Sequence, residues 1–168
     1  MKKVLCIIYP NFSLYEVVCL TSTLALSFGI EIDYVGSDRG IITSEDGLAC
    51  QPTRTLDEVV IEDYSCVILP GMINIAPALH DEKLISFLRS LNQQEILIAA
   101  ISSAPILLAK AGLLKDTNLQ VGFGKTSLTI LNFFHGKISK LKLSCKIKIS
   151  LLLSALHIKS LQEKFFLV

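Results

Sequence analysis

Short apolar runs alternate with longer amphipathic segments over most of the chain. The runs at residues 4–9, 66–69 and 95–101 are rich in Ile, Val and Leu, as are strands buried on both faces of a parallel sheet, and residues 31–36 predict a further strand. The segments between them predict helices over about residues 14–28 and 77–91, and a shorter helix from Pro105 that Gly112 closes. This alternation predicts an α/β domain with a doubly wound, mostly parallel sheet and helices on both faces.

Turn signals set the expected limits of two elements. Ser13 precedes the first helix and Glu16 follows three residues later, which matches a capping box, and Gly29 is a natural residue to end that helix. Residues 41–43 and 48–51 flank the sequence Glu-Asp-Gly at 45–47, which predicts a β-hairpin. An exposed capping-box acid is therefore one interpretation of Glu16, and a place in a functional site is the other.

The charge balance divides the chain into two parts. The 168 residues carry a net charge of +1, which argues against a nucleic-acid or acidic-membrane partner. Residues 1–124 have 8 basic and 14 acidic side chains, whereas residues 125–168 have 8 lysines and the single acid Glu163. We therefore expect one α/β domain over residues 1–124, and we treat residues 125–168 as a separate basic and apolar tail.

The cysteines and the apolar stretches favour a reduced, cytoplasmic protein. The 5 cysteines are scattered and lack the spacing of a zinc site or a disulfide framework. The apolar stretch at 97–114 is interrupted by two serines, a proline and a lysine, so it predicts a buried strand and helix and not a membrane span. We expect no metal, no cofactor and no membrane attachment.

The junction at residues 101–105 carries the strongest chemical signal. A strand that passes directly into Ser102, Ser103 and then Pro105 has the layout of a nucleophile elbow, in which a sharp turn presents one side chain at the end of the sheet. The glycines of a Gly-x-Ser-x-Gly elbow are absent, so simple helix capping by either serine is the alternative. Ligands of doubly wound sheets bind at the carboxyl ends of the strands, where residues 10–16, 70–74 and 102–105 are expected to meet.

Several motifs in about the first 123 residues together resemble the ThiJ/PfpI family, which is related to class I glutamine amidotransferase domains. The resemblance implies the flavodoxin-like form of the doubly wound fold. The matching segments are Lys-Val-Leu at 3–5, Phe-Ser-Leu-Tyr-Glu at 12–16, Ser-Glu-Asp-Gly at 44–47, Asp-Tyr at 63–64, Val-Ile-Leu-Pro-Gly at 67–71 and Ala-Ala-Ile-Ser at 99–102, followed by Pro105 and Leu-Leu-Ala at 107–109.

The resemblance also implies a site. The family usually has a nucleophilic cysteine where this chain has Ser102, and a glutamate at the Glu16 position contacts it. Backbone amides help to bind an oxyanion, and they correspond to Gly71, Met72 and the turn residue Ser103. A cysteine in such a place becomes a thiolate, whereas a serine hydroxyl needs an adjacent general base. Glu16 can be that base only if it is ionised and within hydrogen-bond reach of Ser102.

Two classes of function follow from the resemblance. The first is a stress-response or small-molecule enzyme, a hydrolase, deglycase or lyase. It would act on a small carbonyl or amide substrate, with Ser102 as nucleophile and Glu16 as acid and base. The second is a catalytically inactive binding or chaperone-like domain, or the product of a disrupted gene. A homodimer is also implied, because relatives are commonly dimers.

The tail after about residue 124 differs from the rest in composition. A basic interaction tail, a hydrophobic partner-binding segment and translation in the wrong frame are the competing explanations. Codons that can encode residues 148–161, read one base earlier, give Asn-Ile-Thr-Thr-Ala-Leu-Gly-Phe-Ala-Tyr-Gln-Glu-Phe-Ala, which resembles the family's C-terminal strand and helix. We hypothesise a one-base slip near codons 121–125 that leaves the fold incomplete at its C-terminus, and a gene sequence without the slip would exclude it.

Overall fold

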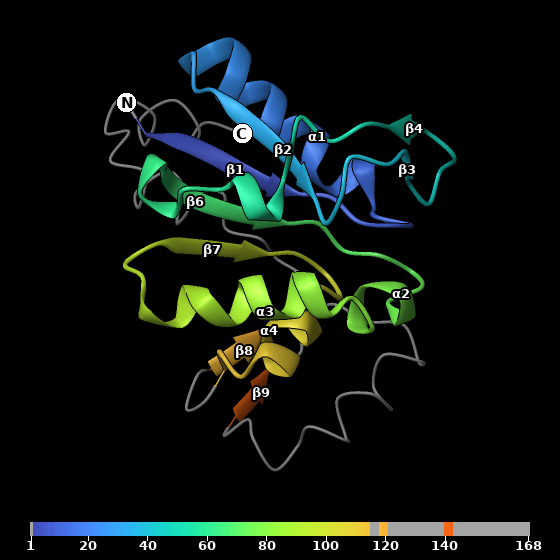
Figure 1. Ribbon diagram of the computed structural model, residues 1–168, viewed down its shortest axis with the longest axis vertical. Helices are drawn as coiled ribbons and strands as arrows, with labels where there is room; N and C mark the ends of the chain where they lie inside the picture. Colours follow the sequence, from blue (N-terminus) through green and yellow to red (C-terminus); the bar gives the residue numbers. More distant parts are fainter. Residues whose placement is uncertain (1, 115–117, 121–139, 143–168) are drawn as a thin grey trace.

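The computed structural model of the protein describes residues 2–114, 118–120 and 140–142. Its centre is a five-stranded sheet in the order β5-β2-β1-β6-β7, in which every pair of neighbours is parallel (Figure 1). The predicted fold class is therefore confirmed. The strands are β1 (Lys3–Ile7), β2 (Ile32–Gly36), β5 (Arg54–Thr55), β6 (Tyr64–Leu69) and β7 (Leu97–Ala100).

The chain winds away from the centre of this sheet in two directions. β1 leads through α1 (Leu14–Ser22) to β2 on one side, and β6 leads through α2 (Ala76–Leu79) and α3 (Glu82–Ser90) to β7 on the other. Figure 1 shows α1 beside β1 and β2, with α3 and α4 (Pro105–Ala111) beside β7. Because the direction changes between β1 and β6, the carboxyl ends of these two strands flank the crevice where such folds bind ligands.

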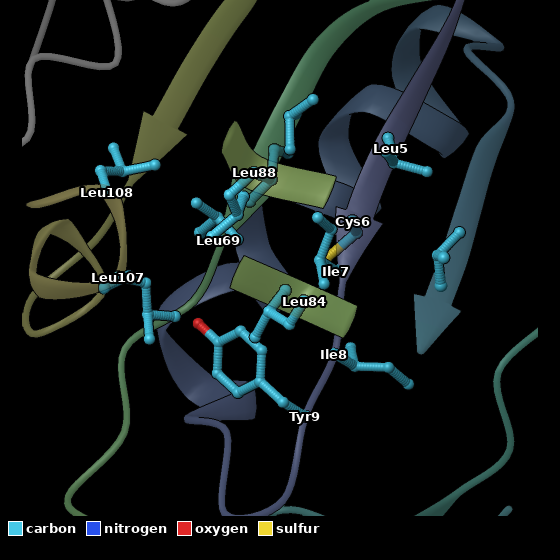
Figure 2. Packing of buried hydrophobic residues seen from close by; sticks show 14 of the residues in the cluster. Leu5, Cys6, Ile7, Ile8, Tyr9, Leu69, Leu84, Leu88, Leu107 and Leu108 are labelled. Carbon is cyan, nitrogen blue, oxygen red and sulfur yellow. The ribbon is translucent and has the colours of Figure 1, made fainter. Parts of the chain in front are cut away.

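The core lies where α3 and α4 pack on the inner strands. The strands β1 and β6 are buried along most of their length. Figure 2 shows Leu84 and Leu88 of α3 over the strands that carry Ile7 and Leu69, with Leu107 of α4 beside them. These five side chains are at most 1% exposed, so the sheet that positions the loops is rigidly packed.

A hairpin, three short helices and a second small sheet accompany the central sheet. The predicted hairpin is present as β3 (Ile42–Thr43) and β4 (Ala49–Cys50), which pair in antiparallel fashion. One-turn 3-10 helices occupy η2 (Leu56–Glu58), η3 (Ile61–Asp63) and η4 (Leu91–Gln93). A separate two-stranded parallel sheet joins β8 (Asn118–Gln120) to β9 (Lys140–Lys142).

Two predicted helices differ from the observed ones. The helix expected over residues 14–28 continues after α1 as a π-helix, η1 (Thr23–Ser27), where the Thr21 and Thr23 hydroxyls bond to carbonyl oxygens of α1. It ends as predicted at Gly29, whose φ is +62°. The helix expected over residues 77–91 is divided into α2 and α3, because the Asp81 side chain accepts the Leu84 N–H at 3.0 Å and starts a new helix.

Within the part of the chain that the structure describes, no helix has both the length and the apolar content to cross a bilayer. Apart from β9, the tail at residues 125–168 lies outside the described residues. The reading-frame hypothesis and the proposed division at residue 124 therefore stay hypotheses.

Candidate functional site

Ser102 occupies a strained position at the turn between β7 and α4. Its φ is +53°, in the left-handed region that residues other than glycine rarely adopt. The Ala104 N–H closes the turn by donating to the Ile101 carbonyl at 2.9 Å. The N-cap of α4 is Ala104, without a side-chain cap, so the alternative in which a serine caps this helix is wrong. Strained backbone of this kind clusters at functional sites, and the observed turn has the form of the predicted elbow.

Glu16 is not a capping-box acid. Its Oε2 accepts a hydrogen bond of 2.6 Å from the Gly71 N–H, on the loop after β6. In a capping box the Ser13 side chain would accept a hydrogen bond from a backbone N–H in the first turn of the helix. Here its hydroxyl instead donates to Glu45 at 2.6 Å. The predicted capping box is therefore wrong, because the adjoining loops offer both side chains other partners.

Gly71 is the point at which the predicted site residues meet. A Cβ atom built at this position would lie 2.5 Å from Glu16 Oε2 and 2.7 Å from Ser102 Cβ. Real Cβ contacts are essentially never this short, so only glycine allows Glu16 and Ser102 to approach the loop together. Gly71 does not have a positive φ, so its role here is close approach and not turn geometry.

The Ser103 side chain is hydrogen-bonded to the backbone of Met72, which follows Gly71 in the loop after β6. Its Oγ accepts the Met72 N–H at 2.9 Å and donates to the Met72 carbonyl at 2.8 Å. Both residues are 4% exposed. The sequence predicted that the Gly71 and Met72 amides bind an oxyanion, but each already donates to a side-chain oxygen of the protein. That role, and the role of the Ser103 backbone, stay predictions.

Glu45 joins the site residues, although the sequence analysis gave it no role beyond a hairpin and a family motif. Its Oε1 accepts the Ser13 hydroxyl and its Oε2 accepts the Ile73 N–H at 2.9 Å, so it ties the hairpin to both neighbouring loops. The Tyr9 hydroxyl donates to the Pro70 carbonyl from below the same loop. The Ser-Glu-Asp-Gly motif was the available signal for Glu45, but a hairpin acid is usually solvated and nothing in the sequence shows its partners.

Burial is the main influence on the chemistry of Glu16. It raises the pKa of this carboxyl above its ordinary value of 4.5; hydrogen bonds from the Gly71 N–H and the Ser102 side chain lower it, and the Glu45 charge raises it again. The net direction of the Glu16 pKa is upward, which suits a carboxyl group that both takes up and releases a proton during a reaction. Among the described residues, no three His, Cys, Asp or Glu side chains gather as a metal site requires.

We expect the reactivity of Ser102 to increase with pH around a midpoint above 4.5. Only the ionised carboxylate can take the serine proton, and a raised pKa moves the appearance of that form to higher pH. The variant Glu45→Gln removes a charge that raises the Glu16 pKa, so its midpoint should lie lower than that of the wild type. Rates measured between about pH 4 and pH 8 test this. Glu62→Gln, which removes an exposed charge in η3, is the control and should leave the midpoint in place.

Comparisons with known proteins identify the family of the chain. The model of the DJ-1/PfpI family matches residues 2–126. The chain is 27% identical over 109 residues to an isonitrile hydratase from Pseudomonas putida, covering 65% of this chain and 47% of that protein. It is 31% identical over 72 residues to DJ-1 protein homolog E from Arabidopsis thaliana, covering 43% and 18%. The chain thus spans less than half the length of both curated relatives.

Solved structures give the same fold. A DJ-1 superfamily protein from Agrobacterium tumefaciens superposes with a TM-score of 0.71 at 20% identity, over 84% of this chain and 74% of that one. Likeness at this identity establishes the fold alone, while the family model covers well over half of the sequence. The resemblance noted from the motifs is confirmed, and the chain belongs to the DJ-1/PfpI family.

Proposed function

We propose that the domain is a serine-dependent hydrolase of small carbonyl compounds, with amides as the main substrate class. Ser102 is the nucleophile and Glu16 is the acid and base. The observation that supports this most strongly is the meeting of the two residues at Gly71, with Ser102 held at a φ of +53°. A hydroxyl nucleophile requires an adjacent general base, and Glu16 is the carboxyl group that approaches Ser102 at Gly71.

The reaction proceeds in two balanced halves. In the first, the Ser102 oxygen bonds to the carbonyl carbon and its proton passes to Glu16, while the carbonyl π electrons move to the oxygen. The carbonyl then re-forms, the bond to the amine breaks, and the amine leaves with the proton from Glu16. In the second half, water attacks the acyl-serine with loss of a proton to Glu16, and the Ser102 oxygen departs with that proton. Water is consumed, and a carboxylic acid and an amine are released.

The alternative function is a binding domain without catalysis. It is supported by the position of His80, the one histidine in the described residues, because its Nδ1 lies 2.8 Å from the Ala76 carbonyl in α2 and not at Ser102. A serine with only a glutamate to activate it is a weaker nucleophile than a cysteine. One matched relative is by name an enzyme, the isonitrile hydratase, which favours the catalytic alternative.

We also propose that the protein forms a homodimer and is located in the cytoplasm. Tyr15, Val18 and Leu26 are 63%, 42% and 87% exposed along one side of α1 and η1. Apolar side chains grouped in this way on a helix are typical of an interface, and a second copy of the chain is the partner that the family resemblance implies.

Hydrolysis of 4-nitrophenyl butyrate tests the proposed activity. We expect Ser102→Ala to lose the protein-dependent rate and Glu16→Gln to lose roughly 100-fold of it, the usual contribution of a positioned base. Ser86→Ala removes an exposed serine from α3 and is the matched control, which should keep the wild-type rate. A rate that survives in Ser102→Ala would exclude the proposal in favour of the binding domain.

A further inference from the structure

The half-buried acid Glu45 is held in place by hydrogen bonds to the two loops beside the hairpin. Its Oε1 accepts the Ser13 hydroxyl at 2.6 Å, and its Oε2 accepts the Ile73 N–H at 2.9 Å. Its own N–H donates to the Phe12 carbonyl at 3.0 Å. Hydrogen bonds to an ionised acceptor are about twice as strong as those between neutral groups, so these contacts fix the position of the Glu45 charge.

This charge lies close to the residues of the proposed hydrolase. Glu16 accepts the Gly71 N–H at 2.6 Å, and Glu45 accepts the Ile73 N–H two residues further along the same loop. Consecutive Cα atoms are about 3.8 Å apart, so these two amides are separated by at most about 8 Å. The Glu45 charge accordingly raises the pKa of the Glu16 carboxyl. Since Glu16 and Ser102 meet at Gly71, the Glu45 charge also acts on a ligand beside Ser102.

Within the described part of the chain, no basic side chain pairs with either carboxylate. The acids of all the ion pairs found there are others, and the basic partners are Lys3, Arg39, Arg54 and Lys83. A third acid, Asp46, follows Glu45 in the turn of the hairpin and is exposed. The edge of the site between the hairpin and the loop after β6 is therefore negatively charged.

We propose that Glu45 is a specificity-determining residue that repels ligands with an anionic group, so that the site prefers uncharged amides and esters to those that end in a carboxylate. Two like charges a few ångströms apart at a protein surface weaken binding, because the solvent only partly screens their repulsion. The effect on turnover rests on the proposed hydrolase function, whereas the effect on binding does not.

Two properties separate charge repulsion from simple support of the loops. If Glu45 only held the loops together, its substitution would affect charged and uncharged ligands alike. If its charge repels anions, the substitution changes the preference between the two kinds of ligand. Repulsion also weakens as salt is added, because the screening length falls from about 10 Å at 0.1 M to about 3 Å at 1 M ionic strength.

The experiment compares two esters of equal chain length on the full-length protein. They are 4-nitrophenyl hexanoate, which is uncharged, and the 4-nitrophenyl monoester of adipic acid, which ends in a carboxylate. The measured quantity is the ratio of their kcat/KM values, in which a change in the ionisation of Glu16 cancels because both esters need the same base. We expect Glu45→Gln to lower the preference for the hexanoate roughly threefold to tenfold.

Two control variants accompany this substitution. Glu62→Gln removes an exposed charge in η3 and should keep the wild-type preference. Ser13→Ala removes one hydrogen bond to Glu45 but leaves the charge and the bond from the Ile73 N–H, so its preference should also be that of the wild type. An unchanged preference in Glu45→Gln, or an equal fall in either control, would overturn the proposal.

If Glu45→Gln does not fold, the wild type decides the matter. Its preference for the hexanoate must fall as NaCl is raised from about 0.02 M to about 0.5 M, and a preference that does not depend on salt overturns the proposal. If the protein hydrolyses neither ester, the hydrolase proposal fails, and binding measured by NMR on the ¹⁵N-labelled protein takes the place of turnover. Hexanamide must then bind more tightly than adipamate at low salt, and equal binding, or no binding of either amide, overturns the proposal.

Discussion

Gly71→Ala is expected to abolish the function of the site while leaving the fold in place. The added Cβ would lie 2.5 Å from Glu16 Oε2 and 2.7 Å from Ser102 Cβ, so one of the two residues must move away. Overpacking of this kind costs about 1–3 kcal/mol in unfolding free energy. Because proton transfer needs hydrogen-bond reach, we expect ester hydrolysis to fall by at least about 100-fold. Urea unfolding and the rate of hydrolysis, measured on the same preparation, test both effects.

Gly29→Ala is the matched control for this substitution. Gly29 has a φ of +62° and nothing lies within 4 Å of a Cβ built there, so the variant is strained in its backbone but free of clashes. It should lose about 1–2 kcal/mol of stability and keep its rate of hydrolysis. Equal rates in the two variants would show that close packing at Gly71 does not maintain the site.

Phe12→Ala is expected to produce the largest loss of stability. Phe12 is 2% exposed, follows β1 and forms an isolated antiparallel bridge with Met72. Its carbonyl also accepts the Glu45 N–H at 3.0 Å, so it lies between the hairpin and the site loop. Removing a buried Phe costs about 3–5 kcal/mol, and urea unfolding measures this directly.

The half-buried Phe28, at the end of η1, provides the comparison for Phe12. Phe28→Ala removes the same atoms from a less enclosed place, so it should cost distinctly less than Phe12→Ala. A loss from Phe12→Ala that is no larger than that from Phe28→Ala would contradict the central packing of Phe12.

The pattern of apolar residues in the sequence predicted most of the central sheet. Buried parallel strands are continuous apolar runs, and these runs placed β1, β2, β6 and β7 to within a few residues. The separation of α2 from α3 was not predicted, because it depends on the Asp81 carboxylate reaching the Leu84 N–H. A helix-compatible sequence does not show which of its polar side chains will cap a new helix.

The candidate site was predictable only in part. Family motifs indicated Ser102, Glu16 and Gly71, and the structure brings the three together. The capping box at Ser13 was a sound local interpretation that failed, because Glu45 and Gly71 lie far away in the sequence and offer better partners. The occupation of the Met72 N–H by Ser103 depends on the relative placement of two loops, and single-sequence reasoning carries no information about that.

The most direct test of Ser102 as an activated nucleophile is covalent labelling of the folded protein with a fluorophosphonate. The intact mass gives the number of adducts, and peptide mapping gives the residue. We predict a single adduct on Ser102, absent from Ser102→Ala, unchanged in Ser86→Ala and slowed in Glu16→Gln. No adduct on the folded protein, or an adduct on another residue that Ser102→Ala retains, would contradict a Ser102–Glu16 nucleophile site.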